Sequence, residues 1–131
     1  MAKLPSKILC DTNFLLVPLR FGIDIFQESE KTLNDKATFY VSSRVLDEIK
    51  ILKKNAKPKF EKELMFAEKM AERCTFIDDS SCSLVDDSLI SLSCEMDMVL
   101  ATTDSMLRKE ARLKGVKVLY LRQRRYLILD G

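Results

Sequence analysis

The sequence predicts a three-layer α/β/α domain whose central sheet is mainly parallel and has about five strands. Short apolar, β-branched or aromatic segments alternate along the chain with longer segments of helical periodicity. Such alternation is typical of parallel strands joined by right-handed helical crossovers. The chain has 131 residues and no internal repeat or linker-like tract, so we expect one domain over residues 1–131.

The first third of the chain begins with a predicted buried strand at residues 7–10, which ends at Asp11-Thr12-Asn13. The apolar residues 14–19 predict a turn or short helix that stops near Pro18. Residues 23–33 have the apolar spacing of an amphipathic helix, and the β-branched and aromatic residues 37–41 predict a second strand.

Two helices follow in the middle of the chain. Ser42 or Ser43 is a suitable N-cap for a helix that runs to about Lys54. Pro58 is suited to the first turn of the next helix, which extends to about Glu72.

The last part of the chain repeats the alternation of short apolar runs and helical segments. Gly115 marks the end of the last helix. The expected elements are strands at residues 74–77, 98–101 and 116–121, helices at residues 84–95 and 104–114, and a sixth strand at residues 126–129 that returns along the sheet edge.

Composition excludes several kinds of chemistry. With no histidine, the chain lacks the usual general base of Ser-His-Asp and Cys-His enzymes, and its three glycines cannot form a phosphate-binding glycine loop. The four cysteines show no C-x-x-C pair, so we expect no zinc site, and three of them are predicted to be reduced core thiols.

No segment predicts a membrane span or a secretory signal, and we expect a cytoplasmic protein. The net charge of +2 does not by itself demand a polyanionic partner.

Carboxylates occur at four successive strand-to-helix junctions of the predicted sheet. Asp11 follows the first strand, Glu48 lies early in the helix after the second, Asp86 and Asp87 open the helix after the third, and Asp104 follows the fourth. Ligands of such sheets bind outside the carboxyl ends of the strands. Clustered carboxylates repel one another unless cations neutralise them, and oxygen ligands select Mg²⁺ or Mn²⁺.

Each carboxylate also has a purely structural explanation. Asp11 could form an Asx turn after its strand, and Asp104 could be the N-cap of its helix. For each residue this structural explanation is as good as the functional one. Glu48 could form an ion pair in the core. It falls between Ile51 and Leu52 on the helical wheel, at the border of the expected apolar face, which favours a functional role over that ion pair.

Two of these carboxylates have an acidic neighbour in the sequence, so we ask which acid of each pair faces the site. Asp47 lies on the polar face of its helix and is expected to be solvated. Ser83-x-x-Asp86 resembles a capping box, which would occupy Asp86 and leave Asp87 facing the site.

Four motifs occur in the order and spacing of a known family: Asp11-Thr12-Asn13 after a strand, Val45-Leu46-Asp47-Glu48-Ile49 on a helix, Asp86-Asp87-Ser88-Leu89-Ile90, and Leu100-Ala101-Thr102-Thr103-Asp104. Together they resemble the PIN domain over essentially the whole chain. The run 101–108, followed by residues 118–123, is similar to the archaeal branch near VapC-type toxins and ribosomal-RNA-processing PIN proteins.

This resemblance implies a metal-dependent endoribonuclease that hydrolyses RNA phosphodiester bonds, either in rRNA processing or as a VapC-like toxin. Bound Mg²⁺ or Mn²⁺ would activate a water molecule, so that no histidine is required. The resemblance further implies a homodimer, for which the apolar residues 14–21 offer support, and an antitoxin or ribosome-assembly partner. The family's residues would correspond to a catalytic and metal-binding quartet of Asp11, Glu48, Asp87 and Asp104, with Asn13 and Thr102 in support.

Basic residues are concentrated in the helices after Glu48 and in the last third of the chain. Solvated helix faces explain the lysines. Arg122, Arg124 and Arg125 on one turn are suited either to protecting an edge strand or to contacting phosphates of single-stranded or looped RNA.

Two other enzyme classes are α/β folds with acids at the carboxyl ends of their strands. A haloacid-dehalogenase-type phosphatase needs an Asp where this chain has Asn13, and a phospho-acceptor receiver domain needs a Lys where Arg122 stands. The remaining alternative is a non-catalytic RNA-binding or assembly factor with the same fold.

Overall fold

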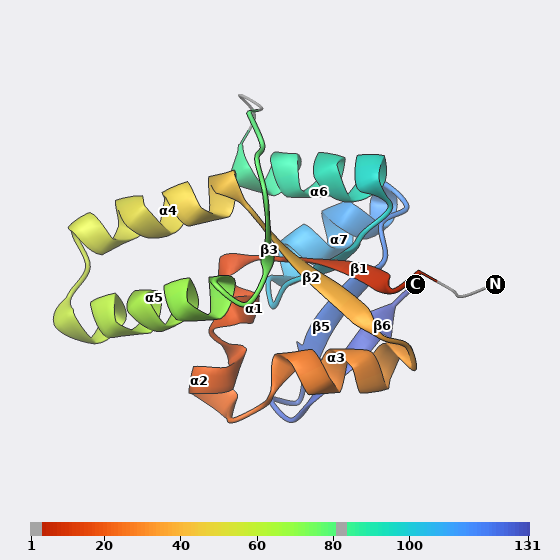
Figure 1. Ribbon diagram of the computed structural model, residues 1–131, viewed down its shortest axis with the longest axis horizontal. Helices are drawn as coiled ribbons and strands as arrows, with labels where there is room; N and C mark the ends of the chain where they lie inside the picture. Colours follow the sequence, from red (N-terminus) through yellow and green to blue (C-terminus); the bar gives the residue numbers. More distant parts are fainter. Residues whose placement is uncertain (1–3, 81–83) are drawn as a thin grey trace.

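The computed structural model describes residues 4–80 and 84–131, in which strands and helices alternate as the sequence predicts (Figure 1). The elements in chain order are β1 (Ser6–Cys10), α1 (Thr12–Leu15), α2 (Val17–Phe21), α3 (Ile25–Leu33), β2 (Ala37–Ser42), α4 (Ser43–Lys54), α5 (Pro58–Ala71), β3 (Thr75–Ile77), α6 (Val85–Met96), β4 (Val99–Ala101), α7 (Ser105–Leu113), β5 (Val118–Arg122) and β6 (Tyr126–Asp130).

The sheet has the strand order β3-β2-β1-β4-β5-β6. Every pair is parallel except β5 and β6, which form an antiparallel hairpin. Leu9 of β1 is in register with Tyr40 of β2 on one side and with Leu100 of β4 on the other. The strands β2 and β3 lie on one side of β1, whereas β4 and the later strands lie on the other. The strand order therefore reverses between β1 and β4, and ligands of open parallel sheets bind at such a switch point.

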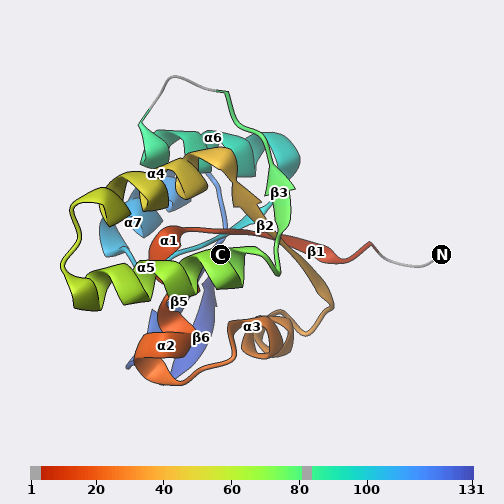
Figure 2. The same ribbon diagram turned by 60° about the vertical axis from the view of Figure 1, so that its left-hand side comes forward.

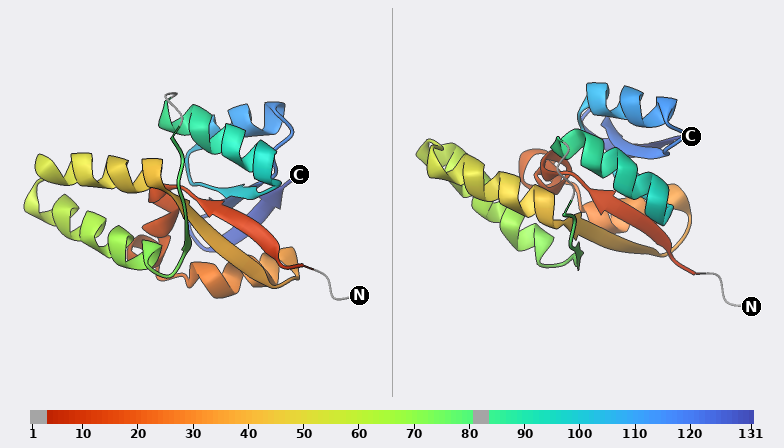
Figure 3. Two further views of the ribbon diagram at one scale, coloured as in Figure 1. Left: turned by 45° about the horizontal axis from the view of Figure 1, so that its top comes forward. Right: turned by 90° about the horizontal axis from the view of Figure 1, so that it is seen from above.

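Helices cover both faces of the sheet, which confirms the predicted three-layer architecture (Figures 1 and 3). The helices α6 and α7 lie on one side and α3 on the other, where it packs against β2 and β6. The helices α4 and α5 form a hairpin that projects beyond the sheet. The predicted sixth strand is also confirmed, since β6 closes one edge of the sheet.

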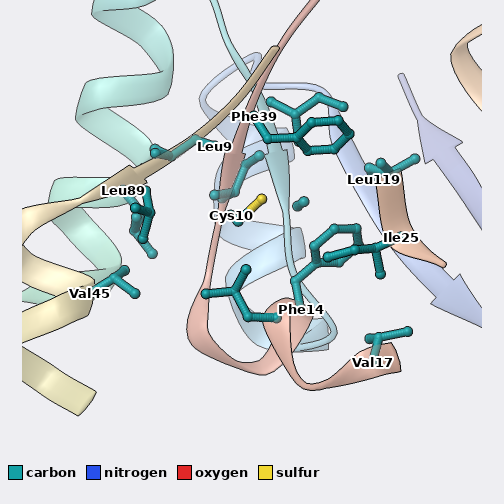
Figure 4. Packing of buried hydrophobic residues seen from close by; sticks show 14 of the residues in the cluster. Leu9, Cys10, Phe14, Val17, Ile25, Phe39, Val45, Leu89 and Leu119 are labelled. Carbon is teal, nitrogen blue, oxygen red and sulfur yellow. The ribbon is translucent and has the colours of Figure 1, made fainter. Parts of the chain in front are cut away.

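The core is centred on β1, in which Ile8, Leu9 and Cys10 are completely buried. Side chains from the two helical layers pack on opposite sides of β1, such as Leu89 from α6 and Ile25 from α3 (Figure 4). A strand that is apolar at consecutive positions is expected where helices cover both faces of a sheet.

The segment after β1 differs from the prediction. Instead of stopping at Pro18, it forms two short helices, and Pro18 lies in the first turn of α2. Proline is tolerated there because an N–H group in the first turn has no partner within the helix. Phe14 and Val17 are completely buried (Figure 4), whereas Leu19 is exposed and Phe21 half-buried, so only the end of residues 14–21 remains as an apolar surface for a dimer.

The described cysteines also differ in their burial. Cys10 is buried, Cys74 half-buried and Cys94 exposed, so the prediction of three core thiols is correct in full only for Cys10. Cys82 lies outside the described residues. A hydrogen bond with Cys74, together with burial, raises the pKa of the Cys10 thiol. Within residues 4–80 and 84–131, no helix has the length and apolar character to span a bilayer.

Ser42 should stabilise the junction between β2 and α4. Its buried hydroxyl accepts a hydrogen bond from the backbone N–H of Val45 at 3.3 Å and so caps the helix that carries Glu48. We expect Ser42→Ala to lower the free energy of unfolding by about 1 kcal/mol, measured by urea denaturation. The control Ser91→Ala, on an exposed position of α6, should change it by less than about 0.5 kcal/mol. Equal effects of both variants would contradict this role.

Candidate metal and nucleic-acid site

Four carboxylates share one pocket at the switch point of the sheet. Asp11 directly follows β1 and Asp104 precedes α7, whereas Glu48 lies in α4 and Asp86 in α6. The pocket has a volume of about 290 Å³ and is completed by the side chains of Thr12, Asn13, Leu16, Arg20 and Phe60.

Asp11 is the most buried of the four acids, with 6% of its surface exposed. Its Oδ1 accepts a hydrogen bond from the backbone N–H of Thr12 at 2.8 Å, and its Oδ2 accepts one from the Thr102 hydroxyl at 2.9 Å. Burial raises the pKa of Asp11 from 3.8 to about 6 against these two hydrogen bonds, and the charges of Glu48 and Asp86 add to the rise. No Lys or Arg pairs with Asp11 in the described part of the chain.

Thr102 and Asn13 connect the ends of β1 and β4. The Thr102 hydroxyl lies 3.2 Å from Asn13 Oδ1 as well as bonding to Asp11, and it accepts a hydrogen bond from the backbone N–H of Asp104. Asn13 Oδ1 in turn accepts the backbone N–H of Thr103 at 2.9 Å. These contacts hold the carboxylates of Asp11 and Asp104 on adjacent strand ends.

Asp104 caps α7 and lines the pocket at the same time. Its Oδ1 accepts the backbone N–H groups of Met106 and Leu107 at 2.9 and 3.3 Å. Both contacts use one oxygen, so Oδ2 is available for a ligand. The structural and functional explanations of Asp104 are therefore compatible, and the same holds for Asp11, which caps α1.

Glu48 is half-buried at the edge of the pocket, where its Oε1 accepts a hydrogen bond from the Thr12 hydroxyl at 3.1 Å. Its neighbour Asp47 is exposed, as predicted. The helical wheel was wrong about the surroundings, because Ile51 and Leu52 are 64% and 39% exposed. Both lie in the C-terminal half of α4, and the hairpin of α4 and α5 projects beyond the sheet (Figure 1).

The structure reverses the expected orientation of Asp86 and Asp87. Asp86 lines the carboxylate pocket, whereas Asp87 lines a separate groove between α6 and α7. The N-cap of α6 is Leu84, so Asp86 occupies the second helical position and not the third position that a capping box requires. Ser83 itself lies outside the described residues. Partial burial raises the pKa of Asp86, and the charges of Asp104 and Glu48 raise it further.

This donor set fits a hard divalent cation. All four acids supply oxygen ligands, and Mg²⁺ and Mn²⁺ favour carboxylate oxygens. A dication would offset the repulsion and burial that raise the pKa of Asp11. Within the described ranges, no three acidic or cysteine side chains stand close enough to form a ready-made ion site, so an ion in this pocket would require the carboxylates to move closer together.

The three arginines of the predicted RNA-binding turn are exposed at the end of β5, on the carboxyl edge of the sheet. Gln123 and Arg124 both have positive φ, at 54° and 57°, as a tight turn between antiparallel strands requires. Arg122, Arg124 and Arg125 do not line the carboxylate pocket.

Sequence reasoning missed several pocket residues, and Arg20 and Phe60 are the two with side chains suited to a nucleic acid. An isolated arginine within the apolar residues 14–21 was the available signal for Arg20. Phe60 had only its position on the apolar face of α5, which is equally typical of a core residue.

The fold and pocket define a parallel α/β domain with a carboxylate site at its switch point, and comparisons with known proteins identify the class further. Residues 8–124 match the PIN like domain family. Ribonuclease VapC4 of Methanocaldococcus jannaschii is 25% identical over 127 residues, which cover 95% of this chain and 97% of that protein. The chain belongs to the PIN-like domain family.

Solved structures share the fold. The PIN domain endonuclease Utp24 superposes with a TM-score of 0.77 at 22% identity, covering 96% of this chain and 92% of that one. A domain of a functionally unknown protein from Methanocaldococcus jannaschii gives a TM-score of 0.66 at 14% identity, covering 89% and 91%. VapBC2 from Rickettsia felis, bound to a DNA fragment from its promoter, gives 0.54 at 15% identity, covering 89% and 100%.

The raised pKa of Asp11 has a measurable consequence in the metal-free protein. Between pH 3.8 and about 6 the folded protein binds a proton that the unfolded chain releases, so stability declines as pH rises through this range. In EDTA at pH 8, we expect Asp11→Asn to raise the free energy of unfolding by about 3 kcal/mol, and this gain should vanish below pH 4.

Urea denaturation across pH 3 to 8 would measure this difference, with Asp47→Asn as an exposed control that leaves the profile unchanged. Parallel profiles for wild type and Asp11→Asn would show that burial does not destabilise the Asp11 carboxylate.

Proposed function

We propose that this protein is a divalent-metal-dependent endoribonuclease that hydrolyses RNA phosphodiester bonds at the carboxylate pocket. The observation that carries the proposal is the meeting of Asp11, Glu48, Asp86 and Asp104 in one pocket, with the most buried acid lacking a cationic partner in the described structure. Membership of the PIN-like family and the relative named Ribonuclease VapC4 support a nuclease that acts on RNA.

In this proposal the four acids hold Mg²⁺ or Mn²⁺, with Asp11 and Asp104 as the central pair. The ion, when bound, would lower the pKa of a water molecule and stabilise charge on the leaving oxygen. Thr102 and Asn13 keep the central pair in place through their hydrogen bonds across the strand ends. Thr12 orients Glu48 by donating its hydroxyl hydrogen to the carboxylate.

The arginine turn and the partners belong to the same proposal. Arg122, Arg124 and Arg125 would contact phosphates of single-stranded or looped RNA, because they are exposed at the edge of the sheet where the pocket lies. The VapC relative and the VapBC2 structure support an antitoxin partner and a role as a toxin, whereas the Utp24 fold is that of a PIN endonuclease. A homodimer remains part of this proposal.

Cleavage of unstructured RNA tests the function directly. We expect cleavage with Mn²⁺ or Mg²⁺, none in EDTA, and a rate at least about 100-fold lower for Asp11→Asn, because a ligand to the metal contributes several kcal/mol to transition-state stabilisation. Asp47→Asn should cleave at the wild-type rate. RNA binding without cleavage under all metal conditions would indicate a non-catalytic RNA-binding or assembly factor instead.

The adjacent aspartates offer a matched pair. Asp86→Asn removes a charge from the pocket, whereas Asp87→Asn removes one from the neighbouring groove on the same helical turn. We expect Asp86→Asn to reduce both the Mn²⁺-induced rise in melting temperature and the cleavage rate, and Asp87→Asn to preserve both. The reverse result would place Asp87 in the quartet, as the family resemblance implies, and would refute the assignment of Asp86.

A further inference from the structure

Arg20 is a cation beside an acidic pocket, yet it does not pair with the pocket's acids. It lies in α2 and lines the pocket with Asp11, Glu48 and Asp104, and it is the only basic residue among the described residues of that lining. Its Nε donates a hydrogen bond to Glu63 Oε2 at 2.8 Å, and its Nη2 lies 2.7 Å from the same oxygen.

The ion pair with Glu63 leaves most of the guanidinium available. The two contacts use two of its five N–H groups, so three can bind a ligand. The Arg20 side chain is 43% exposed, whereas that of Glu63 is 19% exposed. Glu63 therefore acts as an anchor on α5, and the free edge of the guanidinium remains accessible from the pocket.

A negatively charged substrate needs such a cation here. The carboxylates of this pocket would repel an RNA phosphate, and Arg offers planar, paired donors that match phosphate oxygens. A surface ion pair by itself contributes little to stability, so fixing α2 to α5 is a weak reason for an arginine at the rim of an acidic pocket.

Phe60 supplies a second element of a nucleotide site. It belongs to the same pocket lining as Arg20 and is only partly buried, so part of its ring faces the pocket. Aromatic side chains bind the bases of unpaired nucleotides by stacking, whereas bases in a duplex are not accessible to them. The turn between β5 and β6, with its exposed arginines, lies on the same side of the molecule as α2 (Figures 1 and 2).

We propose that Arg20, held in place by Glu63, binds the phosphate of an unpaired RNA nucleotide next to the carboxylate pocket, while Phe60 stacks on the base of that nucleotide. The proposal rests on the proposed function for its choice of RNA as substrate. It adds a subsite that favours single-stranded RNA at the point of cleavage.

Equilibrium binding tests the subsite without requiring cleavage. A fluorescein-labelled oligouridine is titrated in EDTA with the Asp11→Asn protein and with variants in that background, and fluorescence anisotropy is followed at several KCl concentrations. We expect Arg20→Gln to weaken binding about tenfold and to reduce the slope of log K against log salt by about 0.7, the value for one lost phosphate contact.

The control for charge is Lys36→Gln, because Lys36 is exposed directly before β2, at the amino edge of the sheet opposite the pocket. It should change neither affinity nor slope. An Arg20→Gln slope that stays at the parental value, or an equal fall for Lys36→Gln, would refute a specific phosphate contact. Circular dichroism melts establish that each variant is folded, and Arg20→Lys keeps the charge, so it should retain the slope while losing affinity.

Phe60→Leu should weaken binding about tenfold through lost stacking, with the salt slope unchanged. Phe66→Leu, on the same helix and also partly buried but outside the pocket lining, is its matched control and should bind normally. Equal weakening by both variants would refute the stacking role.

Glu63 is a positioning residue in this proposal, because it acts through Arg20. Glu63→Gln should weaken binding by itself but have no further effect when Arg20 is already Gln. Additive effects would refute the coupling.

Loss of binding in Arg20→Gln together with an absence of RNA cleavage by the wild-type protein would support the subsite and refute the proposed function. RNA cleavage by the wild-type protein together with undiminished binding by Arg20→Gln would support the proposed function and refute the subsite.

Discussion

The burial of a carboxylate beside other acids at the switch point of the sheet is the constraint on which the rest of the site depends. Asp11 directly follows three completely buried residues at the end of β1 and is itself only 6% exposed, so the core fixes its position beside its acidic neighbours. Burial and the charges of Glu48 and Asp86 raise its pKa, against the hydrogen bonds that it accepts. The fold thus holds a carboxylate in surroundings that disfavour its charged form, which is typical of functional sites.

Asp11 and Asp104 each contribute both to the fold and to the pocket, because each caps a helix and lines the pocket. Asp11 caps α1 and Asp104 caps α7, so the start of each helix fixes the orientation of the acid that precedes it. Thr102 then ties the two strand ends together. A cap and a ligand are often treated as alternatives in sequence interpretation, but here the capping geometry is what aims the carboxylate.

Much of the fold could be predicted because it depends on short-range patterns. Strand and helix positions followed from alternating apolar runs, from caps such as Ser42 and from Pro58 at the start of α5. The prediction at Pro18 was wrong because proline is equally suited to ending a helix and to its first turn, and only burial of the neighbouring residues on the core separates the two. The error at Ile51 arose because a helical wheel assumes that every apolar residue on one face is covered, whereas Ile51 is 64% exposed on the hairpin of α4 and α5, which projects beyond the sheet.

The sequence by itself determined the mainly parallel α/β class and the delivery of an acid to four successive strand-to-helix junctions, because both depend on local order along the chain and on the common direction of parallel strands. The tertiary structure decided which acid of the Asp86–Asp87 pair faces the pocket, since a one-residue shift in the start of α6 rotates the choice by about 100°. It also decided that Arg20 lies among the acids and is held by Glu63, a residue on another helix. Contacts between residues so distant in sequence are set by how the layers pack, and no local pattern encodes them.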